Sequence, residues 1–226
     1  MIEAGPPWLA PYAQSLPLPL VDVAAALNAH PAAPRRFVAQ DALPAGEPYE
    51  AFIARTRCVP TRNKLHDAFN GLVWLAEPEL KGRLNALQAE AIARDGVQAR
   101  RGPLRDALTV FDENGAIWAD CPLPIRAAWR QRDWQAMFIT HRAHWQQSQP
   151  RLFGHALMEQ LHCAPRKGLT AHVLLDDPLT LSAEDWARKP FLPLPVLGVP
   201  GWWPGNQDPD FYDDPAVFRP LRAVTA

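Results

Sequence analysis

The chain has 226 residues and 48% apolar content, which is enough to bury one substantial core. The formal net charge is −1, so there is no overall positive field to hold a nucleic-acid backbone, and we expect no nucleic-acid partner. No apolar run approaches the roughly 20 residues that cross a bilayer, so we expect no membrane partner either.

The three cysteines, Cys58, Cys121 and Cys163, are far apart and form no CxxC pair. This spacing excludes a zinc knuckle and a thioredoxin-like dithiol, and reduced thiols are typical of a cytoplasmic protein. The first residues contain prolines and a glutamate instead of a basic leader followed by an apolar block. We therefore predict a cytoplasmic protein without a signal peptide.

The 25 prolines concentrate near the two ends of the chain, in 6–34 and 189–220. Proline fixes φ and removes a backbone donor, so both ends should be irregular. Each end also carries large aromatic residues, which need a surface to pack on and could contact a protein partner. We predict three parts: a Pro-rich N-terminal arm over 1–48 packed on the core, an α+β core over 49–188, and a Pro- and aromatic-rich C-terminal arm over 189–226.

The first half of the core is predicted to be helical. Residues 49–57 form a short helix, after which Thr61 occupies an N-cap position. Apolar residues spaced three and four apart predict a helix over 62–76 and another over 79–94, which Gly96 ends.

The second half of the core predicts both strands and helices. Residues 107–111 and 116–118 have β-like composition and flank the tight-turn signal Asp112-Glu113-Asn114-Gly115, so we predict a β-hairpin. The remaining elements are strands over 137–140 and 168–175 and helices over 124–136, 152–163 and 182–188. The mixture predicts an α+β fold, a mainly helical single domain with a small β-hairpin or sheet and irregular Pro-rich ends.

The helix predicted over 62–76 carries an unusual set of polar side chains. Arg62, His66 and Asn70 follow one another at i+4 and share a face, with Asn63 and Asp67 in a parallel row. These side chains ligate, donate and orient, whereas lysine and glutamate are usual on a solvated helix. The pattern fits either a functional site or an ordinary polar surface.

Two further segments carry metal-ligand chemistry. In the helix predicted over 152–163, His155 and Glu159 lie one turn apart and project from the same face. His172 lies in an apolar predicted strand, where it is either a ligand or a core histidine bonded to a carbonyl or carboxylate. Together with His66, these residues suit one divalent transition metal ion, such as zinc, iron or manganese.

The predicted site has metal ligands, a base and substrate-binding residues. The metal ligands are His66, His155 and His172, the fourth ligand or general base is Asp67 or Glu159, and the substrate-binding residues are Arg62, Asn63, Asn70 and Arg105. Such a site predicts a metal-dependent enzyme, a hydrolase of a small polar substrate. The chain has no HExxH, Walker, GxGxxG or GxSxG motif, which counts against common metalloproteases, P-loop NTPases, dinucleotide enzymes and α/β-hydrolases.

The same residues also fit a non-catalytic binding or adaptor protein. In that case the polar stripe is a hydrogen-bond network that holds the helices in register, and the Pro- and aromatic-rich ends contact a partner. A nuclease that uses His66 and the arginines of 94–105 is a weaker interpretation, because the chain is slightly acidic and carries no nuclease motif. We interpret that arginine run as a solvated helix end and loop.

Several segments together resemble a known family. The segments are CVPTRNKLHDAFNGLVWL, LRDALTVFDENGA, LFGHALMEQL and KGLTAH. They are similar to a bacterial family known as domain of unknown function 3025, and the resemblance extends from about residue 50 to the C-terminal FYDDPAVFRP. It implies a bacterial, cytoplasmic origin and supplies no activity, cofactor or catalytic residue.

Overall fold

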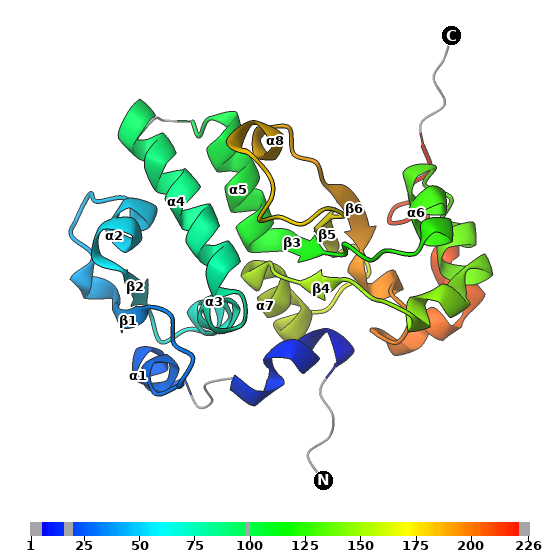
Figure 1. The fold of residues 1–226 in the computed structure, drawn as a ribbon. Helices are drawn as coiled ribbons and strands as arrows, with labels where there is room; N and C mark the ends of the chain where they lie inside the picture. The colour runs from blue at the N-terminus through cyan, green and yellow to red at the C-terminus, as the bar shows by residue number, and fades with distance from the viewer. Residues whose placement is uncertain (1–5, 16–19, 98–99, 222–226) are drawn as a thin grey trace.

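The computed structural model describes residues 6–15, 20–97 and 100–221. Helices surround two small sheets, and the mainly helical α+β prediction is confirmed. Figure 1 shows that α3, α4, α5 and α7 gather beside the central sheet, while α6 and the C-terminal segment lie at its other end.

Eight α-helices follow one another through the described residues. They are α1 Val23–Asn28, α2 Tyr49–Thr56, α3 Leu65–Ala76, α4 Pro78–Asp95, α5 Pro103–Asn114, α6 Leu123–Arg130, α7 His155–Cys163 and α8 Ala183–Ala187. The shorter helical segments are η1 Pro7–Ser15, η2 Gln40–Ala42, η3 Ala136–Thr140, η4 Arg142–Gln146, η5 Val196–Gly198, η6 Pro204–Gln207 and η7 Pro209–Asp213. Of these, η3 is a π-helix and the others are 3₁₀ helices.

The strands form two sheets. Strands β1 (Arg36–Ala39) and β2 (Cys58–Thr61) pair in parallel. The larger sheet has the order β4-β3-β5-β6, with bounds Arg151–Leu152, Gly115–Ile117, Thr170–Leu174 and Leu192–Pro195. Only the central pair β3–β5 is parallel among these, and its register sets Gly115 opposite His172.

The hydrophobic core takes residues from both ends of the chain. Trp8 and Tyr12 of η1 are buried, as are Trp202, Tyr212 and Phe218 near the C-terminus. Stacked aromatic rings in this core contribute stability beyond that of the area they bury. Both Pro-rich ends also supply a strand, because β1 and β6 lie within them.

The β-hairpin predicted around Asp112–Gly115 is wrong, because Pro103–Asn114 forms helix α5. Proline is favourable at the first helical position, and Ala107, Leu108 and Phe111 supply a buried stripe at helical spacing. Asn-Gly therefore ends a helix here. Gly115 has φ −78°, so it does not use the left-handed conformation of a hairpin turn.

The strand predicted over 137–140 is also wrong, because this run lies in the π-helix η3. Its β-like composition reflects burial: Met137 and Phe138 are fully buried, and Phe138 stacks on Trp145 and Tyr212. Tertiary packing outweighs the local strand preference of such residues.

The predicted N-cap at Thr61 is wrong as well. Helix α3 begins at Leu65, and Thr61 is the last residue of β2, where its hydroxyl donates to the Val59 carbonyl at 2.9 Å. Asp67 stabilises the segment before the helix, since its carboxylate accepts from the Arg62 backbone N–H at 2.6 Å.

Among the residues that the structure describes, no helix combines the length and the apolar content that a bilayer span requires.

Candidate functional site

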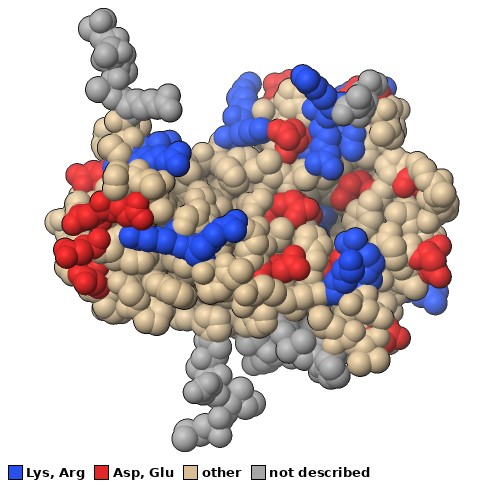
Figure 2. Space-filling view, turned by 180° about the vertical axis from the view of Figure 1, so that it is seen from behind, with Lys and Arg blue, Asp and Glu red and all other residues tan. Residues whose placement is uncertain are grey.

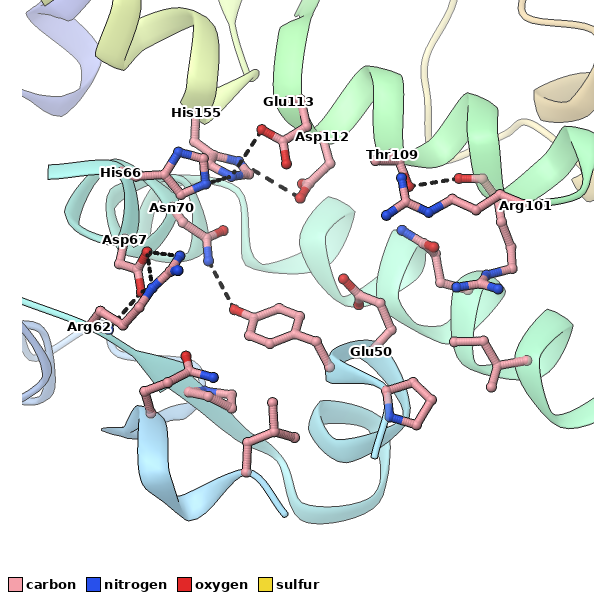
Figure 3. Close-up of a pocket in the computed structure, with 18 residues that line it drawn as sticks. Glu50, Arg62, His66, Asp67, Asn70, Arg101, Thr109, Asp112, Glu113 and His155 are labelled. Atoms are coloured by element: carbon pink, nitrogen blue, oxygen red, sulfur yellow. Dashed lines mark hydrogen bonds and ion pairs between the residues drawn. The ribbon is translucent and has the colours of Figure 1, made fainter. Parts of the chain in front are cut away.

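A pocket of about 440 Å³ lies between the start of α2, the start of α3, the second half of α4, α5 and the start of α7. Its size falls in the range of small-molecule sites. Its polar lining residues are Gln40, Tyr49, Glu50, Arg62, His66, Asp67, Asn70, Gln88, Arg101, Arg105, Thr109, Asp112, Glu113 and His155. Figure 3 shows His66, His155 and Glu113 together on one side and Arg101 on the other.

Two histidines face each other in the pocket wall. The Nε2 atoms of His66 (α3) and His155 (α7) are 3.2 Å apart, and their rings meet edge to face. His155 is 4% exposed, whereas the His66 side chain is 30% exposed. The pairing follows from the packing of α3 against α7, which brings together residues 89 positions apart.

Glu159 fixes the orientation of His66. Its Oε2 lies 2.9 Å from His66 Nδ1, one turn along α7 from His155. Because a carboxylate accepts, the ring carries its proton on Nδ1 and directs the Nε2 lone pair towards His155. Carboxylates use this arrangement to orient metal-binding histidines in many proteins.

Glu113 completes the cluster from the last turn of α5. Its Oε2 is 3.6 Å from His155 Nε2. Among the described residues, His66, Glu113 and His155 offer ligand atoms that all lie within 4.8 Å of one another. The structure thus contains a two-histidine, one-carboxylate group in a pocket wall.

A close crossing of two backbones positions Glu113 beside His155. A Cβ on Gly154 would meet the Asn114 Cα and the Gly115 N at 2.5 Å. Gly154 N–H also donates to the Gly115 carbonyl at 2.8 Å. Only glycine at position 154 allows the start of α7 to approach the end of α5 this closely.

A buried polar network supports the cluster from behind. Lys81 Nζ, 5% exposed as a residue, donates to Asp112 Oδ1 and to Asn70 Oδ1, each at 2.7 Å. Asn70 in turn donates to the Tyr49 hydroxyl at 3.1 Å. Asp112 Oδ2 is 3.8 Å from His155 Nδ1, so the network ends at the histidine pair.

Burial and charge set the protonation of this cluster. Burial lowers the pKa of His155 to about 3, so the ring is neutral, as a metal ligand must be. Burial would raise the pKa of Asp112, but the charge of Lys81, which also donates a hydrogen bond to this carboxylate, outweighs burial, and the pKa of Asp112 is lowered. Burial, then the Asp112 charge, raises the pKa of Glu113.

The two predicted catalytic carboxylates are both occupied by protein partners. Glu159 accepts from His66, as described above. Asp67 lines the pocket, but the Arg62 side chain contacts both of its oxygens at 2.8–3.2 Å, and the Arg62 backbone N–H adds a further bond. Asp67 and Arg62 thus form a fixed pair.

His172 and Asn63 lie apart from the cluster, and neither lines the pocket. The His172 ring instead contacts Phe191, with ring centroids 5.8 Å apart. Asn63 donates to the Val21 carbonyl and accepts from the Val23 N–H, so it holds the start of α1. Of the three histidines predicted as ligands, His172 is thus not part of the cluster, which consists of His66, His155 and Glu113.

Of the other predicted residues, Asn70 and Arg105 line the pocket. Sequence reasoning assigned Glu113 and Asp112 to a turn and so missed both. A helical interpretation of 103–114 would have placed them at a helix C-terminus, where the macrodipole disfavours carboxylates unless a cation is near.

No curated protein and no solved structure matches the chain. A family model described as "Protein of unknown function (DUF3025)" matches residues 35–185 and 175–222, which together span most of the sequence. The chain therefore belongs to the DUF3025 family.

Proposed function

We propose that the protein is a metal-dependent enzyme, a hydrolase that acts on a small polar molecule in the pocket of Figure 3. The observation that carries the proposal is the convergence of two imidazoles and Glu113, with ligand atoms within 4.8 Å of one another. Zinc, iron and manganese all accept two imidazoles and a carboxylate, and an open position would remain for substrate.

The hydrogen-bond pattern of the two rings supports a cation between them. The Nδ1 proton of His66 goes to Glu159, so its Nε2 is a bare acceptor. His155 could donate to His66 Nε2 through its own Nε2–H. The Nδ1 atom of His155 would then carry no proton and would face the Asp112 carboxylate, which is also an acceptor. That Nδ1 atom is buried and has no hydrogen-bond partner among the described residues. With the proton on Nδ1, both Nε2 lone pairs converge, which a metal ion satisfies.

The distance between the rings supports the same conclusion. Two imidazole nitrogens on one tetrahedral zinc ion, each about 2.0–2.1 Å from it, lie about 3.3 Å apart. The Nε2 atoms of His66 and His155 are separated by 3.2 Å. A modest movement of the Glu113 carboxylate would supply the third ligand.

The pocket also contains a group that can accept a proton. A divalent metal contributes Lewis acidity and lowers the pKa of a coordinated water. Burial, followed by the Asp112 charge, raises the pKa of Glu50, which makes its carboxylate a stronger proton acceptor. Glu50 accepts a hydrogen bond from Asn85 and has no ion pair among the described residues. We assign Glu50 the role of base in place of Asp67.

Metal analysis of untagged protein tests the proposal. We expect about one divalent metal per chain, and at least a tenfold loss of affinity in His66→Ala, His155→Ala and Glu113→Gln. His162→Ala is the matched control, because His162 is exposed on the same helix α7. If the wild-type protein bound no zinc, iron or manganese, the proposed metal dependence would be wrong.

The non-catalytic alternative has support from the hydrogen bonds of α3. Asn63, Asp67 and Asn70 all bond to protein groups, as a structural network requires. In a binding or adaptor protein, His66→Ala would lower the melting temperature by several degrees without any metal effect. A partner would then contact the C-terminal segment, where Trp203 is 36% exposed.

We further propose that the protein works in the bacterial cytoplasm. All three cysteines are free, although Cys163 is exposed and open to oxidation. Free thiols persist in a reducing compartment.

A further inference from the structure

We propose that the pocket selects an anionic substrate, one whose phosphate or carboxylate group is held by Arg101 and Arg105. That this ligand is a substrate rests on the proposed function. The anion site itself depends on the two arginines alone.

The arginines of the pocket differ in their partners. Arg62 forms an ion pair, because its guanidinium contacts both oxygens of Asp67. Arg101 and Arg105 also line the pocket, and within the described part of the chain neither forms an ion pair. In addition, the Nε of Arg105 is buried and has no hydrogen-bond partner there.

The buried Nε of Arg105 lies in a concave wall without an acceptor. Burying a donor without an acceptor is costly, so such a group normally has a partner. The fork of donors on arginine matches the two oxygens of a carboxylate or phosphate. A bound anion would therefore supply the acceptor that Arg105 lacks.

The arginines of 94–105 thus lie in two different environments. Arg94 pairs with its neighbour Asp95 at the surface, and Arg100 is exposed outside the pocket, as predicted for a solvated helix end. Arg101, which is also exposed, and the half-buried Arg105 line the pocket. Figure 2 shows acidic side chains around the hollowed centre of one face of the molecule and basic side chains above this centre and on both sides of it.

Helix α5 sets the distance between the anion and the metal-binding residues. Arg105, Thr109 and Asp112 all line the pocket, and their spacing of four and seven residues puts them on one face of α5. Seven residues of helix rise about 10 Å. The anionic group of the substrate therefore lies several bonds away from the group held over His66, His155 and Glu113.

The charge of the pocket supports the same class of ligand. The Arg62–Asp67 and Lys81–Asp112 pairs are internally neutral. Glu113 is assigned to the metal, which leaves Glu50 opposite two arginines. One anionic group on the ligand would balance this excess positive charge.

Anion titration by calorimetry at constant ionic strength tests the inference, with inorganic phosphate in one arm and malonate in the other. We expect one of the two anions to bind, and binding to weaken at least tenfold in Arg105→Gln and in Arg101→Gln. Arg105→Lys keeps the positive charge but lacks the forked donors of arginine, so its anion affinity should lie between those of the wild type and Arg105→Gln. Arg100→Gln is the matched control and should bind as the wild type does. Equal binding by all variants, or binding of neither anion, would overturn the inference.

The same titration on His66→Ala separates the two proposals. Arginine-dependent anion binding in a protein that never binds metal would leave the anion site standing and remove the metal-dependent function. A protein that binds one metal but neither anion would remove the anion site and leave the metal-dependent function standing. Melting curves for each variant establish that the compared proteins are folded.

Discussion

Glu159 acts on the site through His66 and provides a sharp test at the residue scale. Its Oε2 accepts from His66 Nδ1 at 2.9 Å, and its side chain is 34% exposed, so a substitution need not disturb the core. Glu159→Gln keeps the size and a hydrogen-bond acceptor but removes the charge that makes the imidazole a better ligand. We expect the affinity for zinc to fall roughly 10- to 100-fold.

Competition with a coloured chelator measures this change. Glu184→Gln is a suitable control, because Glu184 is 87% exposed on α8. An unchanged zinc affinity in Glu159→Gln, with the control also unchanged, would mean that His66 needs no carboxylate to bind metal and that the pair at 2.9 Å is structural.

Single residues also show how far sequence reasoning reaches. His155 and Glu159 are one helical turn apart, so their shared face follows from spacing alone. The surroundings of His172 could not be predicted in this way, because what a strand side chain meets depends on which elements pack on its face of the sheet. Its ring meets Phe191, a contact that no local pattern encodes.

Gly154 provides the test at the scale of elements, since it sits where α7 begins against the end of α5. A methyl group there would meet backbone atoms of Asn114 and Gly115 at 2.5 Å, and backbone cannot rotate away. We expect Gly154→Ala to destabilise the protein by about 1–3 kcal/mol and to weaken metal binding, because Glu113 and His155 move apart.

Urea unfolding and metal titration measure the two effects together. Gly168→Ala is the control, because a Cβ at that position would meet nothing within 4 Å. A Gly154→Ala protein that keeps wild-type stability and zinc affinity would show that the crossing of α5 and α7 does not position the cluster.

Helix α5 shows why the sequence predicted only part of the site. The Asn114-Gly115 pair has the composition of a hairpin turn, and the short apolar run before it fits a strand or a helix. The helix forms because Ala107, Leu108 and Phe111 are all fully buried against neighbouring elements. This single error removed Asp112 and Glu113 from the predicted site, although the residues themselves were noticed.

At the scale of the whole molecule, the site is assembled from distant parts of the chain. His66, Glu113 and His155 come from three helices, α3, α5 and α7, and their convergence depends on long-range packing. Helices α3 and α7 were predicted near their observed positions, so His66 and His155 could be identified from the sequence, whereas α5 and its Glu113 could not. The meeting point of the helices could not be predicted either, because hydrophobic periodicity fixes which face is buried but not which helices become neighbours.

X-ray absorption spectroscopy of untagged protein loaded with one equivalent of zinc tests the central claim most directly. The account predicts a first shell of nitrogen and oxygen atoms at about 2.0–2.2 Å, with the multiple-scattering signature of two imidazoles and no sulfur. His155→Ala should remove one imidazole from that signature. A spectrum without imidazole ligands, or a chain that retains no zinc, would contradict the account.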